Sequence, residues 1–574
     1  MAPEPRRITV VTDELLGYTR TGGIGTAATF LAVALGRMGH RVEILHAGPV
    51  PTAPLDREWA ELYEAAGVSV RTLERNDSRV EPAFFRRMLD VERALAADPP
   101  AVVIAQDLAA PAYTAIRMRR LGLGFEDVLF VIYCHGTRQW ITDVARKVRV
   151  LPGALAITQL ERASIELADV VVSPSKYLVD WMGKQGWRLP AETRVIPHIT
   201  RPVATGEAQP RAEVTHNGVR RLVFFGRLEE RKGIRPFIGA LNALPPDLAA
   251  EVDVEFLGRS TPTWTPDRVR TLLAEHLRSV SFATDLDQPE ALARLARPGT
   301  LAVMPSFAET FGNTVRECLD CGVPFIASNE GAIPELIAEE DRPRLLFEPT
   351  VDGIASALQR VLSNDDAPRP ARAAFDTASA PEQWADVLEL EPKRHDPVVG
   401  DASAEWVVLR DEGDVPDGNL VETLTKAQAA SGADVVTCGV RVDGVERYFL
   451  GDPGGLGLLA NHYGTTALVR RPLVTNREDR WPLFARLALE GAKIVSVPRA
   501  LVTTARPPGD IATDPATALQ VVAHFERRLP HALKSLARLA AGLAAAEQRQ
   551  PSVTTNGFVR RAVRAARRRM PRVA

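Results

Sequence analysis

The 574-residue chain has little cysteine, and no run of apolar residues in it is long. Its four cysteines are too few for a disulfide framework, so we expect reduced thiols, as in a cytoplasm. No stretch offers the roughly 18 uninterrupted apolar residues of a transmembrane helix. The N-terminal segment has no apolar core ahead of Asp13 and Glu14, which predicts no secretory signal. These absences together predict a cytoplasmic protein.

Charge of one sign is also scarce, because 70 basic residues face 72 acidic ones and the net charge is −2. This balance argues against a nucleic-acid partner for the chain as a whole. The exception is the segment 557–574, which holds seven arginines and no acid. We expect it to be either a solvated tail or a basic helix that makes a peripheral contact with an anionic membrane surface.

What the chain has is a globular composition, with 45% hydrophobic residues, and a length that predicts three to four folding units. Apolar runs alternate with helix-like segments over residues 1–200, where the strands are expected at 7–15, 40–48, 101–107, 129–135 and 170–175. A second series fills residues 219–362, with strands expected at 221–228, 253–260, 279–285, 301–306, 323–328 and 344–349. Continuous apolar strands between helices indicate parallel sheets buried on both faces. We therefore predict two Rossmann-like α/β domains that face each other across a cleft.

The remainder divides into three less regular parts. Residues 363–403 are expected to be a linker with one crossing helix, near 381–390. A shorter α/β domain is predicted over 404–510, with strands at 405–411, 433–442, 465–471 and 493–498. A helical, basic tail is predicted over 511–574.

The most informative motif lies in 304–328, where a buried strand is followed by a helix that we expect to begin near 310–312. Glu309 and Glu317 are eight residues apart, which is about 12 Å along a helix. Two carboxylates at this spacing suit the hydroxyls at the two ends of an extended sugar ligand. Between them, the N–H groups of Phe311, Gly312 and Asn313 suit a phosphate. Taken alone, the spacing favours a solvated amphipathic helix with two surface glutamates.

A second motif lies in 224–233, where a strand ends at Gly226 and two cations follow. Arg227 and Lys232 at a strand end can clamp a diphosphate. By itself, this segment also reads as a solvated charged loop.

Both motifs occur, in this order, in the retaining nucleotide-sugar-dependent glycosyltransferases of the GT-B fold, which residues 1–390 resemble. This group includes glycogen-synthase-like and bacterial cell-envelope enzymes. Its E-x7-E motif corresponds to Glu309 and Glu317, and its G-R-L…K-G segment to Arg227 and Lys232. Further matches are the glycine loop 22–25, His135 in 133–136, and the segments 160–175, 195–199 and 331–337.

The resemblance implies roles for individual residues. Glu309 would contact the hydroxyls of the donor sugar, and Glu317 would contact the ribose. Arg227 and Lys232 would neutralise the departing diphosphate, so no metal or other cofactor would be needed.

The first domain would be the acceptor side. Its Gly23 and Gly25 would let the backbone approach donor and acceptor. His135 would lie beside the transferred sugar, although a histidine in such a position is otherwise more often a core residue. The implied partners are a nucleotide sugar and a saccharide or lipid-linked acceptor for envelope glycan synthesis. The competing functions are a non-catalytic saccharide- or partner-binding scaffold and nucleotide-sugar epimerisation.

Two other motifs point elsewhere only weakly. The glycine loop does not fit a dinucleotide-binding fingerprint, because it lies too far from its strand and because no acidic residue ends the next strand. Cys318 and Cys321 stand alone, so we expect buried thiols and no metal site.

The domain at 404–510 resembles the back half of a GT-A glycosyltransferase. The acidic metal motif of that fold corresponds to residues 409–414, where Gly413 replaces an acid, and a later acidic pair is Glu478 and Asp479. We expect a degenerate, non-catalytic domain that packs on the first domain or helps to hold the acceptor. The alternative is a second active site.

Overall fold

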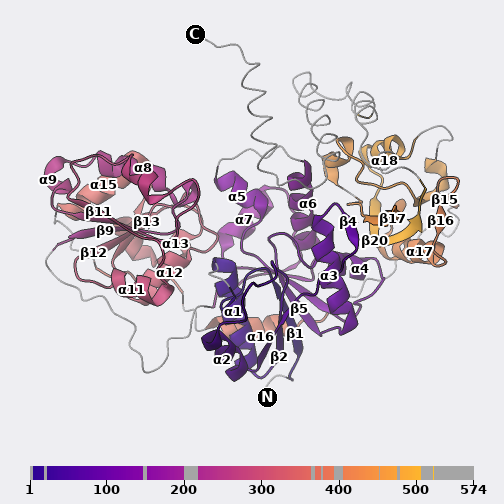
Figure 1. Cartoon of the computed structure of the whole chain (residues 1–574), viewed down its shortest axis with the longest axis horizontal. Coiled ribbons are helices and arrows are strands. Elements are labelled where there is room, and N and C mark those ends of the chain that lie inside the picture. The colour runs from indigo at the N-terminus through magenta and orange to yellow at the C-terminus, as the bar shows by residue number, and fades with distance from the viewer. Residues whose placement is uncertain are drawn as a thin grey trace, which may run out of the picture.

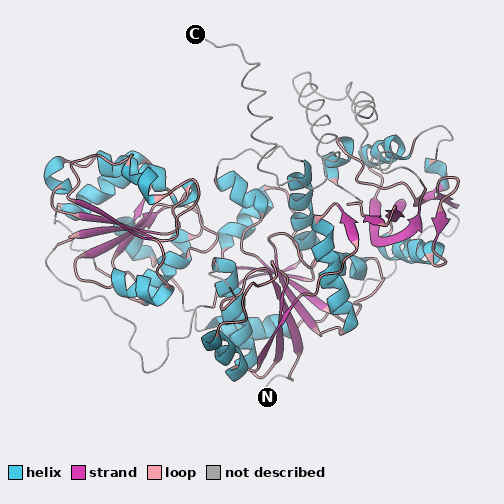
Figure 2. Cartoon of the chain, viewed as in Figure 1, coloured by secondary structure: helices cyan, strands magenta, loops and turns pink. Residues whose placement is uncertain are grey.

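The computed structural model describes residues 4–18, 22–145, 152–199, 218–363, 369–375, 379–392, 405–451, 453–474, 479–505 and 521. The expected tail 511–574, with its basic end 557–574, lies outside these ranges except for residue 521. Three α/β bodies follow one another, as Figures 1 and 2 show. None of the helices in the described ranges has the length and apolar character needed to span a lipid bilayer.

The first body is a parallel sheet of seven strands in the order β3-β2-β1-β5-β6-β7-β8. Its central strands β5 and β6 are buried along their whole length, which is why they read as continuous apolar runs. The strands are β1 Arg7–Thr12, β2 Arg41–His46, β3 Val68–Thr72, β5 Val102–Gln106, β6 Leu129–Tyr133, β7 Val170–Ser173 and β8 Glu192–Val195. The helices are α1 Gly23–Arg37, α2 Arg57–Ala65, α3 Phe84–Ala97, α4 Tyr113–Arg120, α5 Arg138–Val144, α6 Pro152–Leu167 and α7 Lys176–Lys184.

The second body is a parallel sheet of six strands in the order β11-β10-β9-β12-β13-β14. Its strands are β9 Arg221–Phe225, β10 Asp253–Leu257, β11 Ser279–Ala283, β12 Thr300–Met304, β13 Phe325–Ser328 and β14 Leu346–Phe347. Its α-helices are α8 Ile234–Asn242, α9 Pro246–Ala249, α10 Pro266–Arg270, α11 Gln288–Leu295, α12 Asn313–Asp320, α13 Ile333–Leu336, α14 Arg342–Leu345 and α15 Val351–Leu362. The prediction of two Rossmann-like domains is therefore confirmed.

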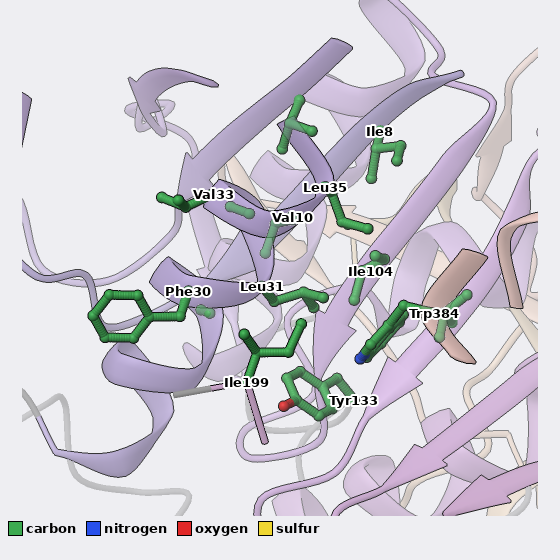
Figure 3. Packing of buried hydrophobic residues seen from close by; sticks show 14 of the residues in the cluster. Ile8, Val10, Phe30, Leu31, Val33, Leu35, Ile104, Tyr133, Ile199 and Trp384 are labelled. Atoms are coloured by element: carbon green, nitrogen blue, oxygen red, sulfur yellow. The ribbon is translucent and has the colours of Figure 1, made fainter. Parts of the chain in front are cut away.

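The chain then returns to the first body through the expected crossing helix, α16 (Ala380–Leu388). Its Trp384 side chain is fully buried and packs in one cluster with Ile104 and Tyr133 of the first sheet (Figure 3). This helix ties the end of the second body to the core of the first.

The third body is a mixed sheet that extends onto the first domain. The four expected strands are present as β15 Trp406–Leu409, β17 Val435–Val442, β19 Ala467–Arg470 and β20 Ile494–Thr503. The sequence did not indicate β16 (Val415–Pro416), β18 (Val445–Arg447) or β4 (Arg79–Glu81). The first domain contributes β4, which pairs in parallel with β18. Two helices, α17 Leu420–Ser431 and α18 Arg480–Leu489, complete this body.

The contact between the third and the first domain consists of an apolar cluster and ion pairs. Phe85 and Tyr448 lie with ring centroids 5.8 Å apart, inside a cluster built from both domains. Arg499 binds both oxygens of Glu92, at 3.0 and 2.7 Å, and the Glu92 side chain is only 2% exposed. The expectation that this domain packs on the first is confirmed; its GT-A-like character stays a prediction.

Candidate functional site

The loop that follows β9 carries the two predicted cations. Gly226 directly follows the strand, and Arg227 comes next with its side chain 45% exposed. A 3₁₀ turn over Glu230–Lys232 then brings Lys232 back beside Gly226. A Cβ added to Gly226 would lie 3.7 Å from the Cδ of Lys232. Gly233 has φ +74 and a Cβ there would meet the Pro305 carbonyl at 1.8 Å, so only glycine fits. Lys232 is thus turned toward the loop that follows β12.

The loop after β12 carries Glu309 and ends in α12. The helix begins at Asn313, with Gly312 as N-cap at φ +96. The observed start agrees to within one residue with the start expected near 310–312, and Glu309 lies in the loop that precedes the helix. A Cβ on Gly312 would lie 3.8 Å from the Glu309 Cβ. The N-terminus of α12, whose first N–H groups have no partners within the helix, therefore lies next to Glu309.

Glu309 is buried and neutralised by two cations. Its Oε1 lies 2.6 Å from Lys232 Nζ, and its Oε2 lies 3.1 Å from the Arg231 guanidinium. Burial alone would raise the pKa of Glu309, but Lys232 and Arg231 outweigh it and lower the pKa to about 2. The side chain is therefore a fixed anion that can accept hydrogen bonds from hydroxyl groups.

Arg231 is a site residue that the motif did not reveal. Besides binding Glu309, its guanidinium lies 5.6 Å from the ring centroid of Trp140, which belongs to the first domain. A cation over an indole face is attractive. The only signal in the sequence was its place between the two predicted cations.

Glu317 lies one turn further along α12 and is half-buried. The Gln288 amide donates a hydrogen bond to its carboxylate. Burial raises its pKa to about 7, despite Gln288, which lowers it. The two glutamates thus differ in pKa, because Lys232 and Arg231 are in contact with Glu309.

The glycine loop of the first domain lies against these residues. Gly23 begins α1, and a Cβ there would lie 2.9 Å from the Asn313 amide nitrogen of α12. A Cβ on Gly22 would lie 3.3 Å from the Arg227 guanidinium. Gly25 is buried on the inner side of α1. Two helix N-termini, one from each domain, therefore converge beside the cation pair.

His135 follows β6 and is half-buried in an aromatic cluster. Its ring stacks on that of His198, with ring centroids 5.1 Å apart. The ring centroids of His198 and Phe311, which belongs to the second domain, are 4.9 Å apart. The Tyr133 hydroxyl lies within hydrogen-bond distance of His198 Nδ1. Burial lowers the pKa of His135 to about 3, and it lowers that of His198 well below its usual value, with His135 adding to the shift. His198, in the segment 195–199, was not singled out as a site residue from the sequence.

Hydrogen bonds between the two domains hold this arrangement together. The Thr310 hydroxyl donates to the His135 carbonyl at 3.0 Å, and the Ser175 hydroxyl donates to the Thr310 carbonyl at 2.6 Å. Glu335 accepts the backbone N–H groups of Lys176 and Tyr177, at 2.9 and 2.6 Å, and so caps α7 of the other domain. The predicted site residues therefore lie in the segments that follow β6, β9 and β12 and in the helices α1 and α12.

No group of His, Cys, Asp or Glu within the described ranges is arranged to hold a metal ion. Cys318 and Cys321 are buried free thiols, as predicted. In the third domain the Asp414 carboxylate accepts the Asp411 N–H at 3.1 Å. Asp479 directly precedes α18, while Glu478 lies outside the described residues.

Comparisons with known proteins cover the two large domains. Residues 21–200 match the family described as Glycosyltransferase Family 4, and residues 219–364 match Glycosyl transferases group 1. A glycogen synthase of Mycobacterium tuberculosis is 26% identical over 396 residues, which are 64% of this chain and 89% of that protein. A D-inositol 3-phosphate glycosyltransferase of Corynebacterium glutamicum is 33% identical over 150 residues, 25% of this chain and 35% of that protein. A solved sucrose-phosphate synthase of Thermosynechococcus elongatus has 20% identity and a TM-score of 0.47, over 67% of this chain and 94% of that one.

Proposed function

We propose that this chain, which its matches over residues 21–200 and 219–364 show to be a glycosyltransferase of the GT-B fold, is a retaining hexosyltransferase. It moves a sugar from a nucleotide-diphosphate donor to a hydroxyl acceptor, a saccharide or lipid-linked saccharide of the cell envelope. Two of its relatives are named for glycogen and for D-inositol 3-phosphate, which are both hydroxyl-rich acceptors. The four cysteines are free thiols, which suits a cytoplasmic location.

The observation that supports this function best is the convergence of Lys232, Arg227 and the N-terminus of α12 beside the glycine loop of the first domain. When the bond between the anomeric carbon and the phosphate oxygen breaks, negative charge develops on the diphosphate. Fixed cations and a helix N-terminus stabilise that charge without reorganising. The protein's own cations take the place of a metal ion in this proposal.

The sugar would lie between Glu309 and His135. Glu309, held as an anion by Lys232 and Arg231, accepts hydrogen bonds from the sugar hydroxyls, while Glu317 contacts the ribose. The acceptor hydroxyl attacks the anomeric carbon from the face that the diphosphate leaves, and its proton passes to the leaving phosphate. The neutral His135 ring can exchange hydrogen bonds with the sugar but adds no charge. Configuration is then retained without a protein nucleophile.

The test uses the full chain with a panel of UDP-, ADP- and GDP-hexoses. We expect one nucleotide to raise the melting temperature and one hexose donor to release nucleotide only when a saccharide acceptor is present. The NMR coupling constant of the product's anomeric proton should show the donor's configuration. An inverted product would refute retention, binding without release would favour a scaffold, and release of an epimerised free sugar would favour epimerisation.

A further inference from the structure

Glu161 of α6 is a fully buried carboxylate that joins two loops at the carboxyl edge of the first sheet. Its side chain is 0% exposed. It accepts the N–H of Ala109, in the loop after β5, at 2.8 Å, and the N–H of Arg138, at the start of α5, at 2.7 Å. The Arg138 guanidinium lies 3.2 Å from the same carboxylate. One side chain thus holds together the loops that follow two neighbouring strands.

The loop after β5 is in a strained conformation. Ala109 and Ala110 have φ +63 and +46, in the left-handed region that residues with a Cβ rarely adopt. Such strain persists only where the surroundings fix the backbone. Glu161 binds the N–H of Ala109, and the Arg87 guanidinium binds its carbonyl at 3.3 Å.

The same loop holds the backbone of His135. Asp107, its first residue, is buried, and its two oxygens accept the N–H groups of His135 and Gly136, each at 2.9 Å. The His135 carbonyl in turn accepts a hydrogen bond from the Thr310 hydroxyl of the second domain. A continuous set of contacts therefore runs from Glu161 through the strained turn to His135.

We propose that Glu161 is a positioning residue for sugar transfer: its carboxylate fixes the Ala109–Ala110 turn and Arg138, and thereby sets His135 where the first domain meets the second. The inference rests on the proposed function for the place of the sugar beside His135. Glu161 itself lies behind the loops, so it acts on the reaction only through their backbone.

The chain offers a matched control in Asp169. This carboxylate is also buried, accepts a backbone N–H (Phe130, 3.0 Å) and pairs with an arginine (Arg119, 2.7 Å). It lies at the amino end of β7, at the opposite edge of the sheet from His135. Asp169→Asn therefore removes a similar buried interaction without touching the site.

The experiment compares Glu161→Gln with Asp169→Asn in the full chain. With UDP-glucose as the donor probe, or whichever hexose donor of the panel is turned over, Glu161→Gln should lower kcat by about 10- to 100-fold, the cost of small misplacement of a reacting group. The donor KM should stay within about threefold, because Glu161 lies away from the donor cations. Asp169→Asn should leave kcat within about twofold. An equal loss of kcat in both variants, or none in Glu161→Gln, would overturn the proposal.

Hydrogen exchange gives a readout that needs no substrate. In Glu161→Gln, peptides covering 107–110 and 134–140 should exchange at least about tenfold faster, while in Asp169→Asn those peptides should be unchanged. Unchanged exchange in Glu161→Gln overturns the positioning role. Accelerated exchange in a protein that transfers no sugar would instead refute only the proposed function.

A second variant keeps the test decisive if Glu161→Gln does not fold. Ala109→Gly removes the left-handed strain, so the double variant Ala109→Gly/Glu161→Gln should be more stable than Glu161→Gln. Its kcat should still lie about tenfold or more below that of Ala109→Gly, because the Arg138 N–H has lost its acceptor. Full recovery of kcat together with stability would show that Glu161 serves stability alone.

Discussion

Lys232 Nζ lies 2.6 Å from Glu309 Oε1, although the two residues are 77 positions apart in the sequence. They come from loops after the neighbouring strands β9 and β12. Because both groups are largely buried, each is held in its charged form by the other. Removing one would leave the other as a buried charge without this partner. The pair thus links the two functions proposed for the donor domain, binding the sugar and neutralising the diphosphate.

The first prediction concerns the cations. Lys232→Ala and Arg227→Ala should each lower kcat by about 10²–10³, because each removes one fixed charge that stabilises the leaving diphosphate. The matched control is Arg235→Ala, from the same segment, whose exposed side chain pairs with Glu230 at 2.8 Å. The control should keep wild-type turnover. Near-wild-type kcat in both test variants would remove the diphosphate assignment.

The second prediction concerns pH. Because burial lowers the pKa of His135 to about 3, the ring takes up a proton only as the pH falls toward that value. It stays neutral from about pH 5 to about pH 8. His135→Asn should therefore lower kcat while its pH profile of log kcat stays parallel to that of the wild type over this range. A limb near pH 6.5 that appears in the wild type and is missing in the variant would show that His135 titrates during turnover.

The third prediction concerns metal ions. Transfer should survive EDTA, because the proposed site uses Lys232 and Arg227 as its cations. Asp411→Ala and Asp479→Ala should keep turnover within about threefold of wild type, a change under about 1 kcal/mol. If chelation stopped transfer and Mn²⁺ or Mg²⁺ restored it, or if Asp479→Ala abolished transfer, the third domain would hold an active site.

The fourth prediction concerns the third domain as a cover for the first. Deleting 404–574 should lower the soluble yield and increase binding of a hydrophobic dye, because Phe85 and its apolar neighbours would be exposed. A deletion of 557–574 alone is the control and should remain soluble.

A point variant tests the same interface without truncation. Arg499→Ala leaves the buried Glu92 carboxylate without its bidentate partner, which should destabilise the protein by about 1–3 kcal/mol. An unchanged melting temperature in Arg499→Ala would show that this ion pair does not hold the domains together.

Much of the fold could be predicted from local sequence. Strands such as β5 and β6 are buried on both faces, so they appear as continuous apolar runs that need no knowledge of their neighbours. The sequence analysis missed five strands. The strands β3 and β8 lie at the two edges of the first sheet, and their partly exposed side chains form no continuous apolar run. The strands β4, β16 and β18 have only two or three residues, and their pairing partners, not their composition, make them strands. The helix α12 was expected to begin near 310–312, and it begins at Asn313 with Gly312 as its N-cap.

The sequence by itself determined the succession of apolar strands along the chain, the cation motif, the glutamate motif and the family resemblance. Each of these is carried by residues that are close together in the chain. Only the tertiary structure decided that Arg231 binds Glu309 beneath Trp140, that His198 stacks on His135 and that Glu335 caps α7. These contacts arise where loops from different strands and from two domains meet, and the distance between loop ends depends on sheet order and domain packing. Charge state followed from the same cause: Glu309 and Glu317 are the same residue type, and the two cations in contact with Glu309 are what separate their pKa values.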